Sequence, residues 1–351
     1  MKILILGGTG AMGKHLSEIL SSDHDVYITT RRNKQKNGKL TYIKGDAHED
    51  YFLNTLLKSN NWDAIIDFMA YTTAEFEKRV FLFLDSTLHY FFLSSSRVFA
   101  NSDSPITEDS SRLLDVCEDK DYLSTDEYAL AKARQENLLR LSGRNNWTII
   151  RPYITYSENR FQLSSMEKEY WLYRALKGKT ILFSKDVADK YTTLTYGYDV
   201  ARGISALIGK KESFGEAFNI TCNECYRWSD ILSNYLDVIE KKTGRRPNVR
   251  EVEKWIPEIG GGATQIKWDR LYNRSFDNTK LNKFIDTKSF STTLVTMANC
   301  LSDFIDNPTF LNINWENEAK KDRLLGEWTN LSSINGFKQK IKYLLYRFGV
   351  L

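Results

Sequence analysis

The sequence is poor in residues that form disulfides or bind metals, with four cysteines and four histidines among 351 residues. Four cysteines are too few to crosslink a chain of this length, so we expect reduced thiols. Cys222 and Cys225 form the only close pair, and Cys117 and Cys300 stand alone. A zinc site would need two more ligands, and all four histidines lie within the first 89 residues, without metal-ligand spacing to the pair. We therefore predict no metal site.

The sequence also lacks a long apolar run and a secretion signal. Runs such as His89–Leu93 fall far short of the roughly 20 residues that cross a bilayer, and they are typical of buried strands. The start of the sequence leads directly into the apolar run Ile3–Leu6, with no long apolar region and no small-residue cleavage site. We expect a cytoplasmic protein without a membrane span.

An excess of charge of one sign is also missing. The sequence has 49 Lys and Arg against 45 Asp and Glu, which leaves a formal net charge of +4. This total does not by itself indicate attraction to nucleic acid or anionic lipid, and a bound phosphate ester would explain it as well. With 42% hydrophobic residues, the chain can bury one large core or two smaller ones.

The first half of the chain alternates β-rich runs with segments of helical spacing, which is the pattern of parallel strands joined by crossover helices. Helices are predicted over Ala11–Leu20 and Ser124–Leu141, and Ser124 with Glu127 has the pattern of a capping box for the second of them. Strands are predicted at Lys2–Leu6, Val26–Thr30, Thr41–Lys44, Ala64–Phe68, Tyr90–Ser94 and Thr148–Arg151.

A glycine-rich turn follows the first predicted strand, and its residues are Gly7, Gly8, Thr9, Gly10, Ala11, Met12 and Gly13. The first glycine of the repeat allows a tight turn, Gly10 lets the backbone approach a pyrophosphate, and Gly13 lets the helix pack closely on the sheet. The phosphates would then lie at the positive end of the helix. Between a strand and a helix, this pattern favours dinucleotide binding over a simple turn.

These observations predict an α/β protein with a Rossmann doubly wound parallel sheet and a smaller C-terminal α/β substrate lobe. After Arg151 and Pro152 the pattern becomes less regular and richer in aromatic residues. We predict an NAD(P)-binding domain over 1–156, with returning segments near 191–207 and 276–300. Residues 157–351 would form mainly the substrate lobe and C-terminal helices, so the two parts are interleaved.

The end of the second predicted strand carries Arg31 and Arg32, where an NAD enzyme usually offers a carboxylate to the adenosine ribose. Two guanidinium groups there could hold a 2′-phosphate, which favours NADP over NAD, although a solvated basic turn would look the same. Asp46 is placed to accept a hydrogen bond from adenine or to stabilise its own turn. Phe68 and Ala70 close the fourth strand near the cofactor.

Tyr128 and Lys132 lie four residues apart on one predicted helix, so their side chains share a face. A tyrosine with a pKa of about 10 is a poor base at neutral pH, and a neighbouring ammonium favours the phenolate and could reach the nicotinamide ribose. This spacing alone is common on protein surfaces. Here it follows a strand that ends in Ser94–Ser96, at the carboxyl edge of the sheet where ligands bind in this fold.

With these motifs in order, the chain resembles the extended short-chain dehydrogenase/reductases, a superfamily of NAD(P)-dependent nucleotide-sugar epimerases and dehydratases, from its start to about Ile220. The segment Phe92–Phe99 resembles the family's serine strand and the turn after it, and counting back from Val98 places the catalytic serine at Ser95. Further matches are Glu136, Arg151-Pro152, Asp199-Val200-Ala201 and Phe218-Asn219-Ile220.

The resemblance implies that Ser95 hydrogen-bonds the reacting oxygen, that Tyr128 exchanges its proton and that Lys132 supports both. It also implies a homodimer. The sequence departs from the family where Phe99 and Ala100 replace Tyr-Gly, and Tyr153–Ser157 lacks the asparagine and Gly-Pro that often help to hold a nucleotide diphosphate.

The leading hypothesis is an epimerase or 4-ketoreductase acting on a nucleotide sugar. A dehydratase is disfavoured because Ser96 and Arg97 follow Ser95, where the family's dehydratases have an acidic set. The alternative is a non-catalytic member that binds RNA or a protein partner. Arg274–Leu281 resembles a segment from a branch that includes RNA-binding chloroplast proteins, and Lys338–Arg347 is basic. The intact Ser95, Tyr128 and Lys132 set favours the enzyme and argues against a nucleic-acid partner.

Overall fold

The computed structural model describes residues 1–350 and divides them into two compact units. Unit 1 comprises residues 1–157, 193–224 and 275–293, and the described part of unit 2 comprises 158–192, 225–274 and 294–350. Each unit is therefore assembled from three separate stretches of the chain.

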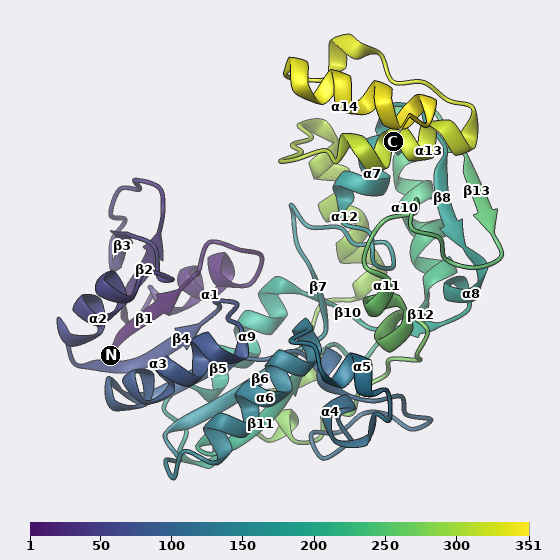
Figure 1. The fold of residues 1–351 in the computed structure, drawn as a ribbon. Helices are drawn as coiled ribbons and strands as arrows, with labels where there is room; N and C mark the ends of the chain where they lie inside the picture. The colour runs from purple at the N-terminus through teal and green to yellow at the C-terminus, as the bar shows by residue number, and fades with distance from the viewer. Residues whose placement is uncertain (351) are drawn as a thin grey trace. The chain divides into compact units, whose positions relative to one another are not determined.

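A seven-stranded parallel sheet forms the centre of unit 1, and it confirms the predicted doubly wound fold (Figure 1). The matched segment Phe218-Asn219-Ile220 lies in a strand over Glu216–Ile220, which is at one edge of the sheet and pairs with the strand that ends at Pro152. In spatial order the strands are β11 (Glu216–Ile220), β6 (Trp147–Pro152), β5 (Thr87–Leu93), β4 (Trp62–Asp67), β1 (Lys2–Leu6), β2 (Asp25–Thr30) and β3 (Leu40–Lys44).

Alternate side chains of β1 enter two different cores because successive residues of a strand point to opposite faces of the sheet. Ile3 and Ile5 pack with α1 (Gly13–Leu20) and α9 (Gly197–Leu207), whereas Leu4 and Leu6 pack with α2 (Asp50–Lys58) and α3 (Thr73–Asp85). On that second face α3 and α6 lie side by side (Figure 1). The helices of unit 1 are α1 (Gly13–Leu20), α2 (Asp50–Lys58), α3 (Thr73–Asp85), α4 (Leu113–Val116), α5 (Lys120–Leu123), α6 (Tyr128–Arg140) and α9 (Gly197–Leu207).

Short elements complete unit 1. The ends of β5 and β4 lead into loops rather than directly into long helices, which leaves room for functional side chains at the carboxyl edge of the sheet. The short elements are the 3₁₀ helices η1 (Ser96–Val98), η2 (Lys211–Ser213), η4 (Leu281–Lys283) and η5 (Thr287–Ser289), and the pair β7 (Ile154–Tyr156) with β10 (Leu194–Tyr196).

Two expected helix starts differ from the structure. The predicted Ser124–Glu127 capping box is wrong, because Asp119 starts α5 earlier and the Ser124 hydroxyl donates to the Asp121 carbonyl. Glu127 itself caps α6, whose first residue is Tyr128. The first helix begins at Gly13 rather than Ala11, after a turn in which the Lys14 N–H donates to the Gly10 carbonyl.

Unit 2 is mostly helical, and α13 and α14 pack against each other at its yellow end in Figure 1. Tyr173, Trp315, Ala319, Ile334 and Tyr343 form a buried apolar cluster there. The helices are α7 (Lys168–Leu176), α8 (Lys185–Ala188), α10 (Trp228–Thr243), α11 (Ala263–Gln265), α12 (Thr293–Asp306), α13 (Trp315–Leu325) and α14 (Phe337–Phe348), with the π-helix η3 (Ile266–Arg270) and the 3₁₀ helix η6 (Leu331–Ser333). Two strand pairs are present, β8 (Ile181–Ser184) with β13 (Val249–Val252) and β9 (Tyr191–Thr192) with β12 (Tyr226–Arg227).

No helix within residues 1–350 is long and apolar enough to cross a bilayer.

Candidate active site

The glycine loop between β1 and α1 is built for close backbone contacts. Gly7 has a φ of +69°, a left-handed conformation that side-chain-bearing residues rarely adopt. A Cβ on Gly13 would lie 2.5 Å from the Gly8 backbone, so the start of α1 packs directly on the loop. A Cβ on Gly10 would meet nothing within 4 Å. The loop is therefore tight where it faces the protein and open at Gly10, at the positive end of α1, and this arrangement fits a dinucleotide phosphate. Of the other predicted cofactor-binding residues in this loop, Thr9 is exposed and Ala11 and Met12 are half-buried.

The ends of β2 and β3 place the predicted adenosine contacts on neighbouring strands. Arg31 and Arg32 are both exposed directly after β2. Asp46 follows β3, where the Gly45 N–H donates to the Thr30 carbonyl and joins the two strand ends. The half-buried Asp46 accepts a hydrogen bond from the His48 N–H at 3.0 Å, so its carboxylate stabilises its own turn.

The end of β4 connects the glycine loop to the helix that carries the predicted base. Phe68 donates its N–H to the Leu6 carbonyl, and the Met69 sulfur would be 2.9 Å from a Cβ on Gly7. The Met69 carbonyl lies 3.5 Å from the Lys132 Nζ. Phe68 is half-buried and Ala70 is exposed. This segment therefore lies close to Gly7 on one side and contacts Lys132 on the other.

Tyr128 and Lys132 occupy the first turns of α6, as their spacing predicts. The Lys132 Nζ lies 6.0 Å from the centre of the Tyr128 ring and 4.6 Å from that of Phe92, in β5. The Tyr128 side chain is 40% exposed, whereas Lys132 is only 2% exposed. The phenol is thus accessible to a substrate, while the ammonium lies behind it against the sheet.

Ser95 lies two residues after the end of β5 and is the N-cap of η1. Its buried hydroxyl accepts a hydrogen bond from the Arg97 N–H at 3.2 Å. The Arg97 guanidinium lies 5.3 Å from the centre of the Tyr128 ring and forms a 2.6 Å ion pair with Glu127, the residue that caps α6. Arg97 therefore joins the serine turn to the start of the tyrosine helix. In the sequence Arg97 stands only where the family's dehydratases have an acidic residue, and its pairing with Glu127, 30 positions later, has no local signal.

A buried carboxylate further along α6 fixes the helix to the sheet. The fully buried Glu136 accepts hydrogen bonds from the Ser94 hydroxyl at 2.6 Å and from two guanidinium nitrogens of Arg151, at 2.6 and 2.8 Å. Arg112 adds a fourth hydrogen bond at 3.2 Å. Burial acts to raise the pKa of Glu136, but the charge and hydrogen bonds of Arg151, with the Ser94 hydrogen bond, hold it below its ordinary value.

Asp67 is a buried acid that sequence reasoning missed, although a carboxylate at the end of an apolar strand was a visible signal. It accepts hydrogen bonds from the Met69 N–H at 2.9 Å and the Tyr90 hydroxyl at 2.8 Å. Burial raises the pKa of Asp67 to about 6, against these hydrogen bonds and the charge of Lys132. Burial lowers the pKa of Lys132 to about 8, against the charges of Asp67 and Glu136.

The contacts thus bring Gly7, Met69, Lys132 and Tyr128 into one connected arrangement, and Ser95 reaches it through Arg97. Among residues 1–350 there is no group of three or more His, Cys, Asp and Glu that could hold a metal, and none of the four cysteines forms a disulfide.

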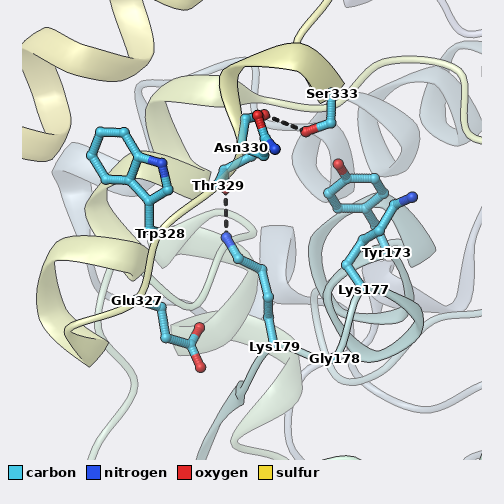
Figure 2. Close-up of a pocket in the computed structure, with 9 residues that line it drawn as sticks. All are labelled: Tyr173, Lys177, Gly178, Lys179, Glu327, Trp328, Thr329, Asn330 and Ser333. Carbon is cyan, nitrogen blue, oxygen red and sulfur yellow. Dashed lines mark hydrogen bonds between the residues drawn. The ribbon is translucent and has the colours of Figure 1, made fainter.

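The structure also contains a cavity of about 450 Å³ in unit 2 (Figure 2). Trp328 and Tyr173 form opposite sides of it, and the Lys179 Nζ donates to the Thr329 hydroxyl. Lys179 also pairs with Asp322, so its charge is already neutralised. None of the predicted site residues lines this cavity.

The chain was compared with known families and curated proteins. The family described as NAD dependent epimerase/dehydratase matches residues 3–221. A chloroplast stem-loop binding protein of 41 kDa b from Arabidopsis thaliana is 28% identical over 236 residues, 63% of this chain and 58% of that protein. UDP-glucose 4-epimerase from Lactobacillus helveticus is 29% identical over 77 residues, 20% of this chain and 23% of that protein. Each alignment thus spans less than two thirds of the relative.

Solved structures share the fold at low sequence identity. The Bordetella bronchiseptica enzyme WbmH, in complex with NAD+, has a TM-score of 0.66 at 14% identity, covering 88% of this chain and 99% of that one. UDP-glucuronic acid 4-epimerase from Bacillus cereus, in complex with UDP-glucuronic acid and NAD, has a TM-score of 0.63 at 18% identity, covering 88% and 100%.

Proposed function

This chain belongs to the NAD dependent epimerase/dehydratase family, and on that premise we propose that it is an epimerase or 4-ketoreductase of a nucleotide sugar. The reaction would be reversible hydride transfer at a secondary alcohol or ketone. The observation that carries the proposal is the buried Lys132 ammonium behind the accessible Tyr128 ring, joined through Met69 to the glycine loop.

The proposed roles follow from these positions. Tyr128 exchanges a proton with the substrate oxygen at its phenolic oxygen, and the charge of Lys132 favours the phenolate form. The Ser95 hydroxyl donates a hydrogen bond to the same substrate oxygen, which stabilises charge that develops there. A nicotinamide cofactor, when bound, accepts or supplies the hydride. Lys132 would also hold its ribose, and Gly10 would admit the phosphates.

The surroundings of Ser95 favour an epimerase or reductase over a dehydratase. The Ser96 hydroxyl donates to the Arg151 carbonyl, and Arg97 is paired with Glu127. These two positions therefore offer no carboxylate that could eliminate water from a sugar.

The cofactor we propose is NADP, with NAD as the alternative. Two exposed guanidinium groups at the end of β2, without a carboxylate beside them in the sequence, suit the 2′-phosphate of NADP. Solved relatives of the fold were crystallised with NAD, so competitive binding of the two dinucleotides is the required measurement. NAD binding at least as tight as NADP binding would contradict this assignment.

The function is tested by incubating the protein and either dinucleotide with a panel of UDP- and dTDP-sugars, followed by NMR of the sugar products. We expect inversion at one carbon or reduction of a 4-keto sugar. Tyr128→Phe is the matched control, because it removes only the phenolic oxygen. The proposal would be contradicted if the parent protein bound the dinucleotide but converted none of the sugars faster than Tyr128→Phe does.

The alternative function is RNA binding without catalysis, and the similarity to a stem-loop binding protein favours it. Residues of Arg274–Leu281, the segment that prompted this alternative, form hydrogen bonds and an ion pair within the protein. Asp277 accepts from the Thr279 N–H, Lys280 pairs with Glu216 at 2.7 Å, and the buried Asn278 bonds Asn223 at 2.8 Å. A salt-dependent gel shift with stem-loop RNA would support the alternative, especially if Lys280→Glu abolished it.

We further propose a cytoplasmic homodimer in which α3 and α6 form the interface. Phe81, on α3, is 53% exposed and would be covered in such a pair. Light scattering that shows a monomer at micromolar concentration would contradict the dimer.

A further inference from the structure

Helix α14 presents large apolar side chains to solvent. Phe337 is 77% exposed, Ile341 41% and Phe348 66%. They are separated by four and then seven residues, so they fall on one face of the helix. Trp328, 47% exposed, packs its ring 6.1 Å from that of Phe348 and extends this surface. We call Trp328, Phe337, Ile341 and Phe348 the outer apolar face.

The opposite side of α14 is fixed to the rest of unit 2, so the outer apolar face cannot turn inward. The buried Tyr343 donates its hydroxyl proton to Asp322 at 2.7 Å and accepts from the Thr329 N–H at 2.8 Å. Arg347 donates to the Glu327 carbonyl at 3.0 Å. These bonds hold the helix in one rotational position.

Charge on α14 is of one sign. Residues 337–350 contain Lys338, Lys340, Lys342 and Arg347 but no acidic residue. Lys342 forms a 3.1 Å ion pair with Glu316, whereas Lys338 is exposed and Lys340 half-buried. By helical spacing, Lys338 and Lys342 flank the outer apolar face on one side and Lys340 on the other.

We propose that α14 binds the surface of an anionic lipid bilayer. An amphipathic helix with Phe and Trp on one face and lysines beside them lies in the headgroup region, where the rings enter the interface and the ammonium groups meet lipid phosphates. Contact with the same face of a second copy would bring Lys338 and Lys340 near the same lysines of that copy, and these like charges repel each other. The positive charge therefore favours an anionic surface over self-association. This proposal is independent of the proposed enzymatic activity.

Flotation of the full chain with phosphatidylcholine vesicles, with and without phosphatidylglycerol, tests the proposal. We expect binding only to vesicles that contain phosphatidylglycerol, and release by added salt. Lys338→Glu/Lys340→Glu should weaken binding by at least about thirtyfold, because the loss of two basic residues near an anionic surface accounts for that much and the added carboxylates repel the surface. Phe337→Ser/Phe348→Ser should abolish stable binding, because the apolar contact is lost.

Control variants make the same kinds of substitution, apolar to serine and lysine to glutamate, away from α14. Leu141→Ser removes an apolar side chain that is 84% exposed in unit 1, and Lys210→Glu/Lys211→Glu reverses two exposed lysines. Both should bind vesicles like the parent. Failure of the parent to bind anionic vesicles, or equal binding by the α14 variants, would overturn the proposal. So would equally tight binding to soluble polyglutamate, or a dimer that Phe337→Ser/Phe348→Ser converts to a monomer, because the occupant would then be an acidic peptide or a second copy.

Discussion

Replacement of Glu136 by alanine should strongly destabilise unit 1. Its carboxylate accepts four hydrogen bonds, from Ser94, twice from Arg151 and from Arg112, and both it and Arg151 are buried. Removal of one partner of a buried ion pair leaves the other charge uncompensated, at a cost of about 3–5 kcal/mol. This is a large part of the roughly 5–15 kcal/mol that stabilises a typical protein. Urea unfolding followed by circular dichroism measures the change in the free energy of unfolding.

Two matched variants separate the buried charge from general effects of substitution. Glu136→Gln keeps the shape and one acceptor oxygen but loses the charge, so we expect the free energy of unfolding to fall by about 1.5–3 kcal/mol. Asp115→Ala removes a 46% exposed partner of Arg112 and should cost at most about 1 kcal/mol. The pKa of Glu136 is held below 4.5, so its contribution is complete above that pH and is lost as the pH falls through the lowered pKa. An alanine variant no less stable than Asp115→Ala would refute the assigned role of this pair.

The other predictions concern the proposed chemistry. Tyr128→Phe should abolish turnover but leave dinucleotide affinity nearly unchanged, Lys132→Ala should lower both, and Ser95→Ala should slow mainly the chemical step; single-turnover rates and dissociation constants measure these differences. Arg31→Ala/Arg32→Ala should weaken NADP binding more than NAD binding in calorimetry, and equal losses would remove the 2′-phosphate contact. Asp67→Asn should lower the pKa of Lys132 below about 8, because an opposing negative charge is lost, so that less Lys132 is protonated at neutral pH. NMR titration of labelled lysine follows this change, and an unchanged or raised midpoint would contradict it.

The fold could be predicted because its signals are local. Apolar runs, the glycine spacing and the Tyr128–Lys132 interval each lie within a few residues, and they determine strand, turn and helix face without knowledge of distant partners. The predicted start of α6 was wrong because a capping pattern is also a local signal and does not show whether an earlier helix already includes its residues. Ser124 is a preferred N-cap residue and Glu127 is not, but the earlier helix α5, started by Asp119, includes the residues before Ser124 and leaves Glu127 to cap α6.

The interactions that support the site could not be predicted, because they join residues far apart in sequence. Arg97 forms an ion pair with Glu127. Burial in the assembled sheet raises the pKa of Asp67, whose charge interacts with that of Lys132. In unit 2, Arg174 pairs with Glu318 across 144 positions, and both are buried. A single sequence gives the charge of each residue but not which opposite charge compensates it.

The most direct test of the proposed chemistry is a single-turnover experiment on the parent protein and Tyr128→Phe, with bound dinucleotide and a nucleotide sugar that the parent converts. The reduced nicotinamide is followed by its absorbance. We predict a substrate-dependent change in the parent and none in Tyr128→Phe, although both bind the dinucleotide equally. A Tyr128→Phe protein that transfers hydride at nearly the parent rate would show that the proton passes through another group, and it would contradict the assignment of this site.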